Sequence, residues 1–270
     1  MVLNMKLKQK VGLIGCGNMG SAILECAIQK KIFSSSQVWV ADKLADKVYA
    51  FAKKHRCRGA EDAAQVAKES DIVLLAVKPQ DLAETAAMIR PFLNSKKIVI
   101  SILAGVKLIG LKKQLGSAVI VRAMPNLGAQ VGESVTAICS TNQNALKAAQ
   151  ALFLACGQVV KLDEKFFDVV TAVSGSGPAY FFLMMELLAD FARLNGMGEK
   201  EARALAVQTA LGAGRLASTS LESPAVLRER VTSKKGTTDA ALSVLKYRNF
   251  KKIFFEALTA AVKRSQQLSR

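Results

Sequence analysis

The stretch that decides the fold is Val-Gly-Leu-Ile-Gly-Cys-Gly-Asn-Met-Gly, at residues 11–20. A short apolar run ends at Ile14, and Gly15, Gly17 and Gly20 then fit the pattern G-x-G-x-x-G. In this pattern the first glycine permits a tight turn, the second lets the backbone approach a pyrophosphate, and the third lets a helix pack closely on a strand. Free N–H groups at the start of that helix favour phosphate. The sequence therefore predicts a dinucleotide-binding turn from Gly15 to Gly20.

Strand and helix patterns alternate outward from this turn over about the first 160 residues. Continuous apolar runs, as expected for strands covered on both faces, occur at Val11–Ile14, Val38–Ala41, Ile72–Val77, Ile98–Ile102 and Val119–Arg122. Amphipathic stretches of helical length lie between them, at Met19–Lys30, Ala45–His55, Asp62–Glu69 and Leu82–Arg90. A further strand, helix and strand are expected within Val135–Leu162. This alternation predicts an α/β domain with a doubly wound parallel sheet.

The pattern changes near Asp163, after which strand signals vanish. Helical patterns follow to the end of the chain, at Phe166–Asn195 around a Ser-Gly-Ser-Gly-Pro interruption, Lys200–Ser218, Pro224–Arg230, Asp239–Tyr247 and Phe250–Leu268. We therefore predict two domains, residues 1–163 and an all-helical part at 164–270. The stretch Lys200–Ser218 is apolar enough to be buried on most sides, so we expect the helical part to pack on a partner subunit.

Composition narrows the function classes. The formal net charge is +17, but the basic residues are scattered and aromatic residues make up 6%, so we expect no specific nucleic-acid binding. The chain has a single histidine, His55, which argues against a Ser-His-Asp triad and a His-rich metal centre, and we predict no metal. His55 lies among basic residues and is predicted to be exposed. The five cysteines show no C-x-x-C spacing, which favours a reducing, cytoplasmic location, and no membrane span is expected.

Polar residues follow several of the predicted strands, at the edge where ligands of doubly wound sheets bind. Asp42 ends the second strand and is suited to the adenosine ribose hydroxyls, which favours NADH, whereas the adjacent Lys43 suits a 2′-phosphate and favours NADPH. Lys78 is positioned to meet an anionic ligand, and Asn126 to hydrogen-bond near a nicotinamide. A helix-capping Asp42, a solvated Lys78 and an ordinary turn at Asn126 are the structural alternatives.

Five segments stand out along the chain, namely Ile14–Gly20, Ala76–Pro79, Arg122–Asn126, Val173–Tyr180 and Val231–Leu242. They occur in the order seen in pyrroline-5-carboxylate reductases, and the chain resembles that family over nearly its whole length. The resemblance implies a Rossmann-like domain followed by a helical dimerisation domain. It also implies NAD(P)H-dependent reduction of the cyclic imine 1-pyrroline-5-carboxylate to L-proline, with dimers that join into a larger ring, such as a decamer.

Carried over by position, the resemblance implies which residues contact the ligands. The cofactor residues would be Ile14, Gly15, Cys16, Gly17, Asn18, Met19, Gly20, Asp42, Lys43, Val77, Lys78, Pro79, Ile102, Leu103, Ala104 and Asn126, with NADPH preferred and NADH accepted. The substrate residues would be Ser233, Gly236, Thr237 and Thr238. Hydroxyl and N–H groups just before a helix that starts near Asp239 independently suit a carboxylate.

Two positions depart from the family pattern. Lys235 stands where the family has a glycine, and it carries strain if the position requires a positive φ. Ala63 stands where many relatives have an asparagine on the adenosine side. Two other functions stay open: a 3-hydroxyacid dehydrogenase, although no Lys-Asn pair follows Gly212–Gly214, and a non-catalytic dinucleotide-binding protein.

Overall fold

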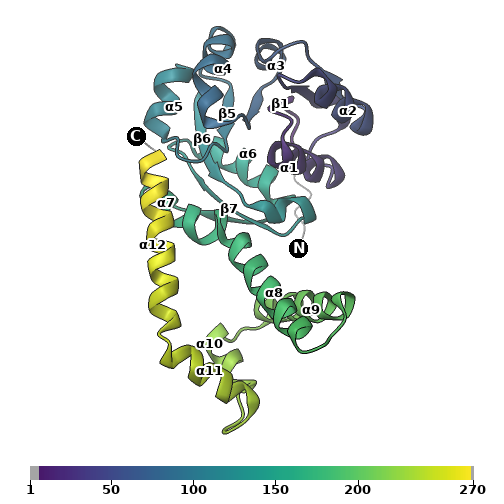
Figure 1. The fold of residues 1–270 in the computed structure, drawn as a ribbon. Helices are drawn as coiled ribbons and strands as arrows, with labels where there is room; N and C mark the ends of the chain where they lie inside the picture. Colours follow the sequence, from purple (N-terminus) through teal and green to yellow (C-terminus); the bar gives the residue numbers. More distant parts are fainter. Residues whose placement is uncertain (1–5, 269–270) are drawn as a thin grey trace. The chain divides into compact units, whose positions relative to one another are not determined.

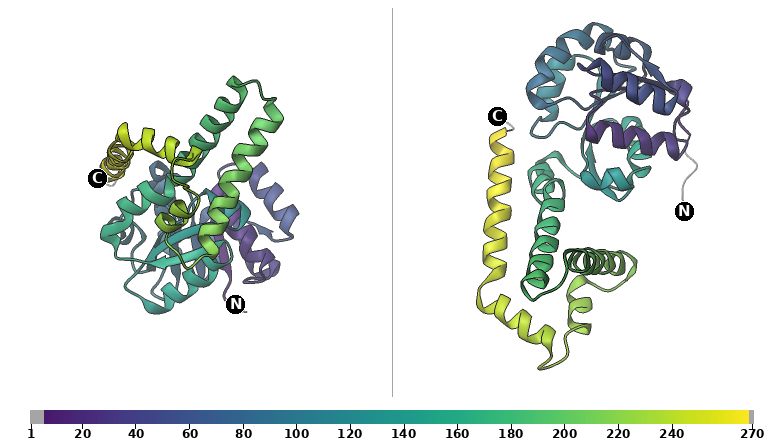
Figure 2. Two further views of the ribbon diagram at one scale, coloured as in Figure 1. Left: turned by 90° about the horizontal axis from the view of Figure 1, so that it is seen from below. Right: turned by 45° about the vertical axis from the view of Figure 1, so that its right-hand side comes forward.

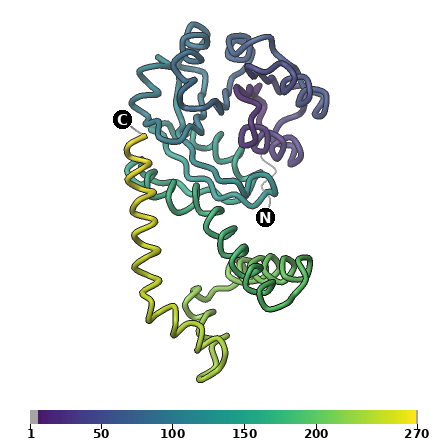
Figure 3. The backbone as a smooth tube through the Cα atoms, in the orientation of Figure 1, coloured from purple at the N-terminus to yellow at the C-terminus, as the bar shows by residue number. Residues whose placement is uncertain are grey.

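A computed structural model describes residues 6–268. The chain forms two compact units: the first combines the residues up to Ser176 with those from Ala261 onward, and the second spans Gly177–Ala260. Figure 3 lets the reader follow the chain from the first unit into the second and back. The division falls later than the predicted 163/164 boundary because Phe167, beyond that boundary, is buried against Ala137 and Cys139 of the sheet.

The first unit contains an eight-stranded sheet in the order β3-β2-β1-β4-β5-β6-β7-β8 (Figure 1). The strands are β1 Val11–Ile14, β2 Val38–Ala41, β3 Arg58–Gly59, β4 Ile72–Leu75, β5 Ile98–Ser101, β6 Val119–Met124, β7 Ser134–Cys139 and β8 Gly157–Lys161. The predicted doubly wound α/β fold is confirmed. Neighbouring strands are parallel except β6 and β7, which run antiparallel. That reversal was not predicted; it follows from the short connection between the two strands.

Helices cover both faces of this sheet. They are α1 Asn18–Gln29, α2 Ala45–His55, α3 Ala63–Glu69, α4 Leu82–Ile89, α5 Leu108–Leu115, α6 Gln143–Leu154 and α7 Phe167–Val170. Along β4, Ile72 and Leu74 join the core that includes α1 and α6, whereas Val73 and Leu75 join the core of α3, α4 and α5. Burial on both faces explains why the strands read as continuous apolar runs.

Short helical turns complete the first unit, namely the 3₁₀ turns η1 Ser35–Gln37, η2 Pro79–Asp81, η3 Arg90–Phe92, η4 Leu127–Val131 and η5 Glu164–Phe166, and the π turn η6 Thr171–Gly175. The π turn ends at Gly175, and a bend at Ser176 separates it from the helix that begins at Gly177, so the predicted interruption within Ser-Gly-Ser-Gly-Pro is confirmed. His55 is another correction: its side chain is only 9% exposed, lies 3.1 Å from Glu25 Oε1 and packs against the Phe51 ring.

The second unit is entirely helical in the part of the chain that is described. It contains α8 Gly177–Leu194, α9 Glu199–Thr219, α10 Pro224–Arg230, α11 Thr237–Tyr247 and the first part of α12 Phe250–Leu268. Helices α8 and α9 pack side by side (Figure 2). In α9 only Ala202 and Ala206 are buried, so the single chain leaves exposed the helix that we expected to be buried on most sides.

Large apolar side chains of the second unit are exposed. Helix α8 exposes Phe181, Phe182, Leu183, Met184, Leu187, Leu188, Phe191 and Leu194, and α9 exposes Leu205, Val207, Leu211 and Leu216. The run Glu164–Leu194 is also long and apolar enough to cross a membrane by length and composition, with a mean hydropathy of 1.2 in the tested window. Such a surface requires a covering layer.

The end of α12 returns to the first unit. Ser265, which is 4% exposed, donates its hydroxyl to Asp168 Oδ1 at 2.7 Å. Leu268 lies against Gly105, where an added Cβ would be 3.0 Å from the Leu268 carbonyl oxygen. The first unit is therefore assembled from two separate stretches of the chain.

Candidate cofactor and substrate sites

The turn after β1 has little room at two of its glycines and open space at the third. Gly15 has φ +101°, and a Cβ there would lie 2.6 Å from the Ala76 carbonyl oxygen. A Cβ on Gly20 would lie 2.6 Å from the Gly15 carbonyl oxygen and 2.8 Å from the Leu13 side chain. Gly17, by contrast, has no neighbour within 4 Å of an added Cβ. These environments match the roles predicted for the first, third and second glycines of a pyrophosphate turn.

Helix α1 starts at this turn without a side-chain cap from any described residue on its first N–H groups. Gly17 is the N-cap residue, and no side chain among the described residues caps the helix. The pKa of the Cys16 thiol is raised to about 12, mainly because the thiol is buried and to a smaller extent because the Asp42 carboxylate is near. The thiol is therefore neutral at physiological pH, so that the turn presents N–H dipoles without an added negative charge.

Asp42 lies beside the glycine turn, as predicted. Its Oδ2 accepts a hydrogen bond from the Cys16 N–H at 2.7 Å, and its Oδ1 accepts one from the Leu44 N–H at 2.9 Å. The carboxylate thus connects the loop after β2 to the turn after β1. This is the position at which an acidic residue meets the ribose hydroxyls of a dinucleotide.

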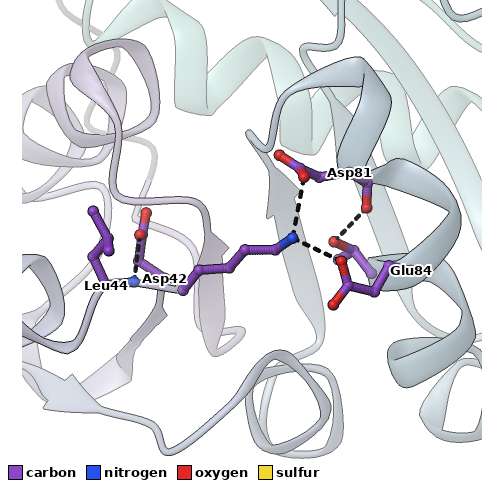
Figure 4. Close-up of polar contacts among 6 residues, drawn as sticks. Asp42, Leu44, Asp81 and Glu84 are labelled. Carbon is purple, nitrogen blue, oxygen red and sulfur yellow. Dashed lines mark hydrogen bonds and ion pairs between the residues drawn. The ribbon is translucent and has the colours of Figure 1, made fainter.

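Lys43 has partners that the sequence reasoning did not anticipate. Its ammonium donates to Asp81 Oδ1 at 3.1 Å and to Glu84 Oε2 at 2.7 Å (Figure 4). The hydrogen bonds to Glu84 and Asp81 raise the pKa of Lys43, which keeps the side chain charged. The signal that could have found this contact is that Asp81 and Glu84 closely follow the candidate segment Val77–Pro79.

The remaining cofactor candidates lie at the same edge of the sheet. Val77, Lys78 and Pro79 follow β4, Ile102–Ala104 follow β5, and Asn126 follows β6. In the sheet, β5 lies between β4 and β6 and is parallel to both. The structure thus brings all the predicted cofactor residues to the carboxyl ends of five adjacent strands. Ile14 and Leu103 are each 3% exposed and pack in the core, so their side chains are not free for a ligand.

Asn126 has a structural role that the sequence also allowed. Its side-chain oxygen accepts from the Gly128 N–H at 3.1 Å and caps η4. The nearby Arg122 has a role that we missed: its side chain is 4% exposed, lies 2.9 Å from Glu164 Oε1 and stacks over the Phe167 ring. Arg122 therefore fixes the start of the helical region against the sheet.

The substrate candidates form a tight loop in the second unit. The Gly236 N–H donates to the Ser233 carbonyl at 2.9 Å, and a Cβ on Gly236 would lie 2.3 Å from Ser233 Oγ. Helix α11 begins at Thr237, two residues earlier than expected, so Thr237 and Thr238 lie in its first turn. No side chain among residues 6–268 caps this helix start.

Lys235 adopts the conformation that was suspected from the sequence. Its φ is +62°, in the left-handed region where a side chain is unfavourable. Its N–H donates to Asp239 Oδ2 at 2.9 Å, which ties the loop to the first turn of α11. Ala63 is the first residue of α3. Residues 6–268 contain no group of three or more His, Cys, Asp or Glu side chains arranged to hold a metal ion.

Two family descriptions match the chain. The pyrroline-5-carboxylate reductase dimerisation family matches residues 164–268, and the family of NADP oxidoreductases that are coenzyme F420-dependent matches residues 10–105. Together they cover the glycine turn, the loops after β2 and β4, and the whole of the Ser233–Thr238 loop.

Full-length relatives give the same result. A curated pyrroline-5-carboxylate reductase of Synechocystis is 40% identical and covers 97% of this chain and 98% of its own. A solved pyrroline-5-carboxylate reductase of Coxiella burnetii, 34% identical, superimposes with a TM-score of 0.92 over 98% of this chain and 100% of its own. The Plasmodium falciparum pyrroline carboxylate reductase, solved with NADP bound, is 29% identical, with a TM-score of 0.86 over 98% and 100%. The chain belongs to the pyrroline-5-carboxylate reductase family.

Proposed function

We propose that this protein is an NAD(P)H-dependent oxidoreductase that reduces 1-pyrroline-5-carboxylate to L-proline, the last step of proline biosynthesis. The observation that carries this proposal is the glycine turn. Its two crowded glycines and its open Gly17 lie at an uncapped helix start in a chain of this family. The reaction adds hydride to the carbon of a C=N bond, and the nicotinamide supplies that hydride when the cofactor is bound.

The residues present fit a dinucleotide. The N–H groups at the start of α1 hold its pyrophosphate, and Asp42 and Lys43 face its adenosine ribose. The part of the site nearer the nicotinamide is lined by Val77–Pro79, the backbone of Ile102–Ala104, and Asn126. NADPH is the preferred cofactor and NADH is accepted. The neutral Cys16 thiol keeps negative charge away from the phosphates.

The loop before α11 binds the cyclic imino acid. N–H groups at the uncapped start of α11, together with the Ser233 and Thr237 hydroxyls, receive its carboxylate. The Thr238 hydroxyl orients the ring nitrogen, and Gly236 lets the Ser233 hydroxyl lie close to the loop backbone. An imine is basic enough to take up a proton without a dedicated acid, so this chain needs to supply orientation and exclude water.

The protein works as a homodimer that assembles further, up to a decamer. The exposed apolar side chains of α8 and α9 are covered by a second copy and not by lipid, and the protein resides in the cytoplasm without binding nucleic acid. In the dimer the Ser233–Thr238 loop of one subunit lies over the nicotinamide of its partner. By role, residues 1–163 act as the cofactor domain and residues 164–270 as the dimerisation and substrate domain, a division that differs from the two compact units of the fold.

A steady-state assay tests the activity. Purified protein is given 1-pyrroline-5-carboxylate with NADPH or with NADH, and cofactor oxidation and proline formation are both measured. We expect turnover with both cofactors and a higher kcat/KM with NADPH. As a control for the alternative dehydrogenase function, the protein is given a 3-hydroxyacid together with the oxidised nicotinamide cofactor, and no turnover is expected. Folded, oligomeric protein that turns over neither cofactor with the imine would refute the proposal.

A further inference from the structure

The contacts of Lys43 extend across the glycine turn. Lys43 follows β2, while Asp81 ends η2 and Glu84 lies in α4, both after β4. Since β2 and β4 are the two neighbours of β1 in the sheet, the Lys43 ion pairs link the two sides of the turn that follows β1. The ion pairs therefore lie beside the place where the adenosine ribose of a dinucleotide binds.

The ion-pair cluster carries more negative than positive charge. Two carboxylates, those of Asp81 and Glu84, contact the ammonium of Lys43, and the carboxylate of the preceding residue, Asp42, is directed to the glycine turn. The Asp42 oxygens are occupied by backbone N–H groups, so the ammonium pairs with the other two acids (Figure 4). The Lys43 and Glu84 side chains are 59% and 64% exposed, which means that an incoming ligand can reach them.

We propose that Asp81 and Glu84 are specificity-determining residues, which hold Lys43 and thereby weaken the preference for a 2′-phosphorylated cofactor. This inference rests on the proposed function. A 2′-phosphate has to draw the Lys43 ammonium away from two carboxylates and remain close to both of them. A 2′-hydroxyl leaves the ion pairs intact and donates to Asp42 instead. The pair of acids thus explains how one site accepts both NADPH and NADH.

Binding of two small probes isolates this effect from catalysis. Adenosine 2′,5′-bisphosphate and adenosine 5′-monophosphate differ only by the 2′-phosphate, and calorimetric titration of the intact protein gives a Kd for each. Glu84→Gln should strengthen binding of the bisphosphate relative to the monophosphate about two- to fivefold, the range expected for an exposed ion pair. Asp81→Asn combined with Glu84→Gln should strengthen it further, and Lys43→Met should weaken it.

Two controls make the result specific. Glu69→Gln removes a carboxylate that pairs with Lys10 at the opposite edge of the sheet, and it should leave the ratio of the two Kd values unchanged. In a Lys43→Met background the gain from Glu84→Gln should shrink, because the acid then has no ammonium to hold. Asp81 makes no side-chain cap to α4, so Asp81→Asn does not remove a helix cap.

The outcomes separate the two claims. If both probes bind but the ratio of their Kd values is unchanged in the double variant, the acids do not determine specificity, while the proposed function stands. If the gain is the same with and without Lys43, the acids repel phosphate without acting through the lysine, and the inference is wrong in that form. If neither probe binds folded wild-type protein, the dinucleotide site is wrong and this inference falls with it.

Discussion

At the scale of single residues, the three glycines of the turn after β1 differ in the space around them, and this difference predicts how they tolerate a methyl group. Gly17→Ala meets no atom within 4 Å, so the free energy of unfolding should change by no more than about 1 kcal/mol. The added methyl lies in the path of the pyrophosphate, so the Kd for NADP should rise about tenfold. Gly20→Ala forces its methyl against backbone and should cost about 1–3 kcal/mol of stability.

Denaturant unfolding and calorimetric titration of both variants check this prediction. A Gly17→Ala protein that binds NADP as wild type does would show that the pyrophosphate does not approach Gly17. A Gly20→Ala protein of wild-type stability would show that α1 can move away from β1 at no cost.

The sequence predicts the roles of some residues better than those of others. The roles of Gly15, Gly17 and Gly20 follow from local backbone geometry, which a motif of six residues encodes. The partners of Lys43 were missed because Asp81 and Glu84 are 38 and 41 positions away, and only the sheet order brings them close. His55 was misjudged for the same reason, since its partner Glu25 lies on another helix.

At the scale of elements, the loop before α11 carries a strained residue whose replacement tests the loop. Lys235 has φ +62°, where glycine is favoured, while Lys234 is not among the residues with positive φ. Lys235→Gly should raise the free energy of unfolding by about 0.5–1 kcal/mol, because the relief of left-handed strain exceeds the entropy cost of glycine. Lys234→Gly is the matched control and should lower it by about as much.

Thermal and denaturant unfolding of the two variants at equal protein concentration measure the difference. Equal destabilisation by both would mean that Lys235 is held without strain, for example by its N–H bond to Asp239. Since Lys235 lies in the proposed substrate loop, the KM for the imine should be followed in parallel.

Elements were predicted well where apolar periodicity defines them. The strands of the cofactor region were found because both faces are buried, and the helices after Asp163 because no strand pattern competes. The two-residue strand β3 was missed since Arg58–Gly59 carries no apolar run. The antiparallel β7 was predicted as a strand but not as reversed, because direction is set by the connection and not by the strand's own residues.

At the scale of the whole molecule, two features predict complementation between subunits: the exposed apolar helices, and the fact that the two proposed sites belong to different units of the chain. Thr238→Ala should lower kcat/KM about 5–30-fold by removing one hydrogen bond to the substrate, with cofactor affinity retained. Gly17→Asp should abolish cofactor binding by charge repulsion, while an aspartate at this N-cap position favours helix α1.

Mixed dimers of these two variants test the shared site. If each site combines one subunit's glycine turn with its partner's Ser233–Thr238 loop, a mixed dimer contains one intact site and should have about half the wild-type activity. Differently tagged subunits allow the mixed species to be purified and assayed. Activity no higher than that of the Thr238→Ala parent, or a fully active monomer in sedimentation, would contradict the arrangement.

The return of α12 to the first unit has a consequence for how the chain folds as it is made. Ser265 and Leu268 occupy positions beside Asp168 and Gly105, yet they are synthesised after the whole second unit. At a synthesis rate of about 5–20 residues per second, the first unit lacks these two contacts for on the order of 10 s, while the second unit is being synthesised. During this interval the surface beside Gly105, next to the Ile102–Ala104 segment, is exposed, so the last native contacts of the first unit form only after the second unit has been synthesised.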